Sequence, residues 1–157
     1  MKTIKFKNWK LIVDEELTKS TYKKAEMGSA SSCVCNECKN YSAYRENVFP
    51  EEIKNLFSEI GIDFNKESEI TRYCKQKSGL HFYGGWFHFK GELIGENCKK
   101  EHEENSYTFQ LTKIEENFSI GFHLSSALTF FEDKNNLIQI EFETEITWVI
   151  AKELETE

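Results

Sequence analysis

The chain has 157 residues, with 20 Lys and Arg against 27 Asp and Glu, and a formal net charge of −7. A chain of this length makes one domain, residues 1–157, that hides about 70% of its extended surface, so a core can form without metal or disulfides. The negative charge disfavours broad attraction to nucleic acid or to an anionic membrane, and we expect neither as a partner.

No uninterrupted apolar stretch and no small-residue cleavage site occur in the N-terminal segment MKTIKFKNWKLIVDEEL, so a secretion signal is not expected. No apolar run approaches the roughly 18 residues that a membrane span needs. We therefore expect a cytoplasmic protein, in which cysteines stay reduced. The five cysteines are also an odd number, so they cannot all pair within one chain.

The first predicted strand covers residues 3–8, where Ile4 and Phe6 alternate with Lys5 and Lys7. Like charges on one strand face repel unless a neighbouring strand carries the opposite charge. The long strand predicted at residues 137–150 carries such charges. We therefore predict that the two strands are neighbours, with the lysines facing the glutamates of the later strand.

Two helices are predicted next. The first runs from about residue 35 to residue 47, because the residue before Pro50 avoids helical backbone angles. The second begins at Pro50, which suits a first helical turn, and Gly61 can supply its left-handed cap. Its apolar residues recur at helical spacing: these are Ile53, Leu56, Phe57 and Ile60.

Residues 68–94 are predicted to form two strands around the sequence YGGWFHFKGEL. Gly84 and Gly85 inside a strand pattern indicate a bulge, a bend, or the close approach of another backbone or a ligand. Trp86 and His88 then share one face. One interpretation is an aromatic-lined site for a small molecule, with His88 as its polar group. The alternative is a core strand bent at its glycines, since any buried strand shows aromatic alternation.

From about residue 105 onward we predict a meander of antiparallel strands near residues 107–111, 118–124 and 137–150. The last strand would extend about 44 Å at about 3.4 Å per residue, so it must curve or carry a bulge. Its wet face is expected to carry Gln139, Glu141, Glu143 and Glu145. His123 on the preceding strand is expected to be solvated.

Together these elements predict an α+β fold. We expect a curved antiparallel β-sheet of about six strands, with two short helices packed on one face or end.

The segment SSCVCNECKN, residues 31–40, carries three cysteines: Cys33, Cys35 and Cys38. Thiolates are soft ligands that suit zinc or iron–sulfur chemistry, and a structural zinc takes four ligands. The Cys35-x-x-Cys38 pair is one standard half-site. The pair Cys98 and His102, spaced C-x3-H, could complete it, so we predict a zinc site whose ligands come from these five residues.

Two other interpretations of the thiols stay open. Cys35 and Cys38 also match the C-x-x-C spacing of thiol oxidoreductases, in which a helix N-terminus lowers the pKa of the first thiol. Glu37 between them disfavours a thiolate. Cysteines also fill cores as small apolar residues, although Ser31, Ser32 and Asn36 give this segment the character of a loop.

The sequence contains no G-x-S-x-G, P-loop, G-x-G-x-x-G, H-E-x-x-H or EF-hand pattern. We therefore predict a small cytosolic binding or interaction domain without catalytic machinery, whose cysteine loop carries a structural zinc. Its partner is a protein or a small molecule. The alternative is a thiol-dependent enzyme that uses Cys35 or Cys38 as a redox centre or nucleophile.

Overall fold

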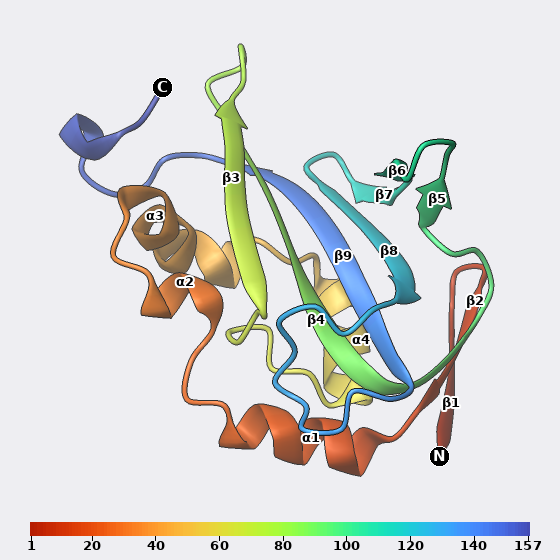
Figure 1. Cartoon of the computed structure of the whole chain (residues 1–157). Coiled ribbons are helices and arrows are strands. Elements are labelled where there is room, and N and C mark those ends of the chain that lie inside the picture. The colour runs from red at the N-terminus through yellow and green to blue at the C-terminus, as the bar shows by residue number, and fades with distance from the viewer.

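A computed structural model describes residues 1–157 and shows a mostly antiparallel sheet with helices, as the α+β prediction requires (Figure 1). The main sheet has the order β1-β2-β4-β9-β8-β7, and β3 also pairs with β4. Its strands are β1 (Lys2–Phe6), β2 (Trp9–Val13), β3 (Glu69–Lys75), β4 (His81–Ile94), β7 (Thr112–Glu115), β8 (Phe118–Leu124) and β9 (Leu137–Ile146). Strands β5 (Lys99–Glu101) and β6 (Tyr107–Phe109) form a separate pair.

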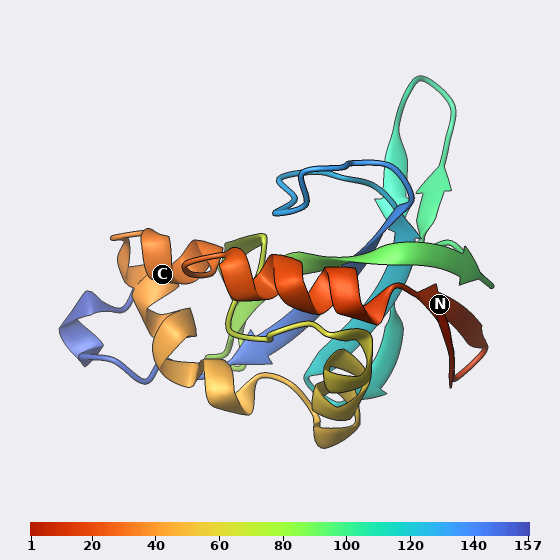
Figure 2. The same cartoon turned by 90° about the horizontal axis from the view of Figure 1, so that it is seen from below.

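The helices are α1 (Glu15–Lys24), α2 (Ser29–Ser32), α3 (Asn36–Tyr44) and α4 (Glu51–Ile60), with short 3-10 turns at Arg45–Asn47 and Lys152–Leu154. Figure 2 shows α4 on one side of the sheet, and the β5–β6 pair and the loop between β8 and β9 on the other. The aromatic rings of Phe49, Phe87 and Phe142 meet between α4 and the sheet, where ring centroids lie 5.2–5.8 Å apart.

Both predicted helices are confirmed. Helix α3 and its 3-10 turn end before Phe49, and α4 begins directly after Pro50. The apolar residues expected on the buried face of α4 are all buried, and Gly61 ends this helix in the left-handed conformation at φ 99°. Because its φ lies in the region that L-residues avoid, Gly61 is the residue type that this cap favours.

The two strands predicted within residues 68–94 are β3 and β4, and the glycines mark a close approach between them. A Cβ atom added to Gly85 would lie 2.3 Å from the backbone oxygen of Glu69 on β3. At Gly84 the ring of Tyr73 occupies the equivalent space. The strand therefore admits only glycine at residue 85 without moving its neighbour.

The prediction that residues 3–8 lie beside residues 137–150 is wrong. Strand β1 forms a hairpin with β2, in which Lys5 faces Lys10, and the neighbours of β9 are β4 and β8. A hairpin closes a very short loop, which costs little conformational entropy, and this local pairing prevails over the charge argument. Lys113 on β7 does not face the glutamates of β9 either, because its partner is Ser119 on β8.

The predicted wet face of β9 is also wrong over its first half. Gln139 and Glu141 are only 3% and 8% exposed, and His123 is 4% exposed. The cause is mutual pairing: the Nε2–H of His123 donates to Glu141 Oε1 at 3.0 Å, and the amide of Gln139 donates to the same oxygen. Buried polar groups with such partners avoid most of the desolvation penalty.

Strand β9 ends at Ile146, four residues before the predicted end. Beyond it, the side chain of Asn40 on α3 takes the place of a neighbouring strand. Its amide donates to the backbone oxygen of Thr147, and its oxygen accepts from the backbone N–H of Val149 at 2.7 Å. The strand predicted at residues 107–111 belongs to the separate β5–β6 pair, whereas β7, β8 and β9 form the expected meander.

Helix α1 was not predicted, and it completes one edge of β4. Strand β3 covers this edge up to Trp86, and β2 covers it from Gly91 onward. Between them, the hydroxyl of Tyr22 donates to the backbone oxygen of His88 and accepts from its N–H, both at 2.9 Å. The hydroxyl of Thr18 accepts from the N–H of Lys90 at 3.2 Å. Side chains of a helix therefore replace the missing strand partners.

Replacing Tyr22 with Phe should leave both backbone groups of His88 buried without a partner. Each unsatisfied group costs about 1–3 kcal/mol, so we expect the free energy of unfolding to fall by about 2–4 kcal/mol. Urea unfolding followed by circular dichroism measures this change. The matched control is Tyr73→Phe, because Tyr73 is 57% exposed. Equal effects of the two substitutions would contradict the role assigned to Tyr22.

Candidate functional site

The three clustered cysteines lie where α2 ends and α3 begins. Cys33 caps the C-terminus of α2, Cys35 is the N-cap of α3, and Cys38 lies in the first turn of α3. The Sγ atoms of all three lie within 4.8 Å of one another, and those of Cys33 and Cys35 are 3.2 Å apart. The sequence grouped these residues correctly, and the chain turn between the helices brings their thiols together.

Backbone N–H groups point at two of these sulfur atoms. The N–H of Cys35 donates to Cys33 Sγ at 3.5 Å, and the N–H of Cys38 donates to Cys35 Sγ at 3.4 Å. The hydrogen bond from the Cys35 backbone holds the pKa of Cys33 below its usual value. Burial raises the pKa of Cys38 well above its usual value. The site therefore contains one thiol that ionises readily and one that ionises with difficulty unless a cation is present.

The sulfur triangle has the size of one face of a metal tetrahedron. With Zn–S bonds of about 2.3 Å, two thiolates of a tetrahedral site lie about 3.8 Å apart. The Sγ atoms of Cys33 and Cys35 are 3.2 Å apart, and no two of the three sulfur atoms are more than 4.8 Å apart. The three sulfur atoms are therefore close enough together to bind one ion.

A buried ion pair fixes the segment that leads into the cluster. The Nη2 of Arg45 lies 2.9 Å from Glu67 Oε1, and the guanidinium also donates to Ser31 Oγ at 3.2 Å. The same Glu67 oxygen accepts from the N–H of Ala30 on α2 at 2.9 Å. Burial raises the pKa of Glu67, while Arg45 acts in the opposite sense. Because α2 is attached in this way, Cys33 is held against the start of α3.

A groove of about 350 Å³ lies between the cysteines and β3. The cysteines line one side, and Glu69, Arg72 and Tyr83 lie on the strands across from them. The hydroxyl of Tyr83 donates to the backbone oxygen of Glu37 at 2.6 Å, which fastens the first turn of α3 to β4. Glu37 also lines the groove, and its own backbone N–H, with Cys35, Thr156 and Arg72, lowers the pKa of its carboxyl.

Cys98 and His102, the other two predicted zinc ligands, do not join this group of ligand atoms. They belong to the segment around β5, on the opposite side of the sheet from α2 and α3 (Figure 1). Cys98 is buried against Gly121 of β8, and Nε2 of the exposed His102 lies 2.8 Å from the hydroxyl of Thr108. The spacing of residues in the sequence could not reveal this. The distance between the two groups of ligands depends on where the folded chain places β5 relative to α2 and α3.

Trp86 and His88 lie on the face of β4 that is turned away from α4. Nε2–H of His88 donates to Gln139 Oε1 at 2.9 Å, and its Nδ1 lies 3.2 Å from Ser68 Oγ. The indole of Trp86 donates to the backbone oxygen of Ala127 at 2.9 Å. The polar atoms of both residues thus have partners within the chain, and a small-molecule site around them stays a prediction.

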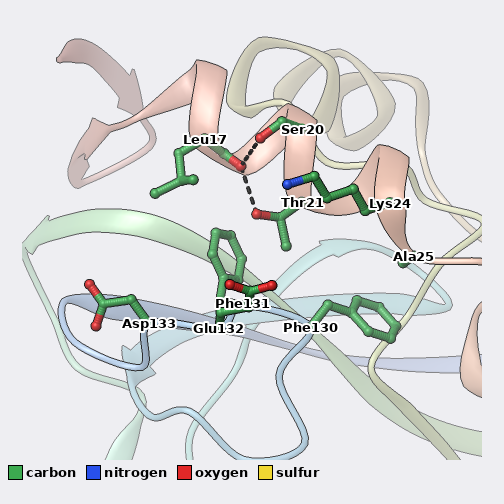
Figure 3. Close-up of a pocket in the computed structure, with 9 residues that line it drawn as sticks. All are labelled: Leu17, Ser20, Thr21, Lys24, Ala25, Phe130, Phe131, Glu132 and Asp133. Atoms are coloured by element: carbon green, nitrogen blue, oxygen red, sulfur yellow. Dashed lines mark hydrogen bonds between the residues drawn. The ribbon is translucent and has the colours of Figure 1, made fainter.

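A second groove, of about 310 Å³, lies between α1 and the loop before β9 (Figure 3). Phe130 and Phe131 lie on the loop side, and Leu17 and Thr21 on the helix side. The hydroxyl of Thr21 already donates to the backbone oxygen of Leu17 at 2.7 Å. No pattern in the sequence predicted this groove. It offers apolar contact but few free polar groups, so the cysteine cluster is the stronger candidate for chemistry.

No helix of the chain is both long and apolar enough to cross a membrane. Comparisons with protein-family models, with curated proteins and with solved structures found no match to this chain.

The burial of His88 should make stability depend on pH. Burial lowers the pKa of His88 to about 4, whereas an unfolded chain has a histidine pKa near 6.5. The unfolded chain binds the proton more readily between these values, so the free energy of unfolding should fall as the pH drops from about 6.5 to 4. The difference between the two pKa values corresponds to about 3 kcal/mol.

Urea unfolding at several pH values tests this for the wild type and for His88→Gln. The substitution removes the titrating group, so the decline between pH 6.5 and pH 4 should become shallower by about that amount. His102→Gln is the matched control, because His102 is exposed and its removal should leave the slope unchanged. An equally steep decline in His88→Gln would refute the assignment.

Proposed function

We propose that the chain is a small metal-binding domain in which the thiolates of Cys33, Cys35 and Cys38 bind one zinc ion. The observation that carries this proposal is the convergence of three Sγ atoms within 4.8 Å. Two backbone N–H groups directed at the sulfur atoms support it, because they stabilise the negative charge of thiolates. Zinc suits sulfur ligands and imposes no geometry beyond the tetrahedron.

The role of the ion would be local. It would join the end of α2 to the first turn of α3, two short elements that the buried Arg45–Glu67 pair already holds in place. We place the protein in the cytoplasm, where thiols stay reduced and available to a metal. The partner that such a domain would bind is a protein or a small molecule.

Metal analysis of the purified chain tests the proposal. Native mass spectrometry under reducing conditions should find about one zinc per chain, with about two to three protons released on binding at pH 7. Replacing Cys33, Cys35 or Cys38 with Ser should lower the zinc affinity by more than the roughly 10- to 100-fold expected for an outer-shell partner. Cys74→Ser and Cys98→Ala are the controls and should leave it unchanged. Loss of zinc in either control would contradict the three-cysteine site.

A second candidate function, dithiol chemistry, is favoured by the 3.2 Å separation of the Cys33 and Cys35 sulfur atoms. The sequence favoured Cys35 or Cys38 as the reactive thiol. The structure favours Cys33, whose pKa is lowered. In such a reaction the Cys33 thiolate would attack a disulfide substrate and release one half, which takes the proton of the Cys35 thiol. The resulting Cys35 thiolate would attack Cys33 in the mixed disulfide, close one disulfide within the chain and release the second half as a thiolate.

Thiol titration separates the two functions. If the purified chain holds no metal and one thiol reacts fast, and if Cys33→Ser abolishes this fast phase, dithiol chemistry is supported. If the chain holds zinc and its clustered thiols react only after a chelator is added, metal binding is supported. Slow reaction of every thiol in a metal-free chain would reject both functions.

A further inference from the structure

We infer that the metal centre keeps one coordination position open toward the groove, and that this position takes a neutral imidazole nitrogen from another molecule. This inference rests on the proposed zinc site. Three thiolates occupy three corners of a tetrahedron, and zinc sites with three protein ligands leave the fourth corner to water or to an external ligand.

The chain itself offers no fourth ligand atom beside the three sulfur atoms. Two carboxylates, those of Glu37 and Glu69, line the groove. One oxygen of Glu69 accepts from Ser29 Oγ at 3.0 Å and from the N–H of Ile70 at 2.8 Å. The carboxylate of Glu37 lines the same groove, and no oxygen of either residue belongs to the group of ligand atoms that lie within 4.8 Å of one another. Either carboxylate would have to move toward the sulfur atoms to reach the ion.

The fourth corner is accessible. Cys33 and Cys38 are half-buried and Cys35 is exposed, and all three line the groove of about 350 Å³. This volume lies at the lower end of the range of about 300–1,000 Å³ that small-molecule sites occupy. One ring-sized group could therefore enter from solvent and reach an ion held by the cysteines.

Charge selects the kind of ligand. Zinc with three thiolates carries one net negative charge, and Glu37 and Glu69 in the groove add two more. Arg72 offsets only one of these, and its guanidinium already donates to the backbone oxygen of Glu157 at 3.1 Å. An anionic fourth ligand would be repelled at short range. A neutral imidazole avoids this repulsion, and its nitrogen is a good zinc ligand.

The test uses the full chain loaded with Co²⁺ at pH 8, whose visible absorption reports the ligands of the ion. Imidazole should change this absorption and should bind at least ten-fold more tightly than azide, an anion of similar reach. In Glu69→Gln, which keeps the oxygen that accepts from Ser29, azide should gain about 3- to 10-fold relative to imidazole. Glu92→Gln, an exposed position on the far end of β4, is the matched control and should change neither affinity.

A further arm identifies the source of the imidazole. If the tripeptide Lys-His-Lys binds more tightly than free imidazole and Glu-His-Glu binds less tightly, the donor is a histidine of a basic protein segment. If free imidazole binds more tightly than both peptides, the donor is a small molecule.

Two results would overturn the inference while leaving the zinc site intact. Cobalt that binds through the three cysteines but shows no response to imidazole would mean that a group of the chain fills the fourth corner. Tighter binding of azide than of imidazole would mean that the charge argument is wrong. If Co²⁺ does not bind to the cysteines, the proposed function itself fails, and the absorption shows this before any ligand is added.

Discussion

The requirement that strand β4 be hydrogen-bonded along its whole length organises this domain. One edge is satisfied by β9, which pairs with β4 from His81 to Lys90. The other edge is divided among β3, the side chains of α1 and β2. A buried strand loses stability when its backbone groups lack hydrogen-bond partners. This cost favours the placement of each of these segments along the edge of β4. Strand β3, which walls the cysteine groove, is placed by this requirement.

The outer face of the sheet shows a second consequence of the same packing. Ser68, His88, Gln139, Glu141 and His123 form a continuous series of hydrogen bonds across β4, β9 and β8. Buried polar groups of this kind do not add stability as an apolar core does. They penalise any other register, because a shift of one residue would leave them unpaired or exposed. The series therefore specifies how the three central strands align.

Sequence signals within a single element predicted that element well. Features that depend on contacts between distant segments were predicted poorly. Pro50, Gly61 and the apolar spacing between them were enough to place α4, because capping and periodicity act within one helix. The partner of β1 was missed, because electrostatic complementarity between distant strands is weak beside a local hairpin. Helix α1 was missed because its two buried residues, Thr18 and Tyr22, are polar, and a search for apolar periodicity does not find them.

The cysteine site also shows this difference between local signals and long-range contacts. The three thiols lie within six positions of one another, so a single chain turn brings them together, and the sequence was sufficient to group them. The core is built from the sheet and all four helices, and of the clustered cysteines only Cys38 packs against it. A small zinc finger folds only when its metal binds. Here the Arg45–Glu67 pair and the hydroxyl of Tyr83 already hold α2 and α3 against the sheet. The fold therefore holds the three cysteines in place without the metal. A metal that is not needed to hold the fold together can leave one coordination position open to an external ligand.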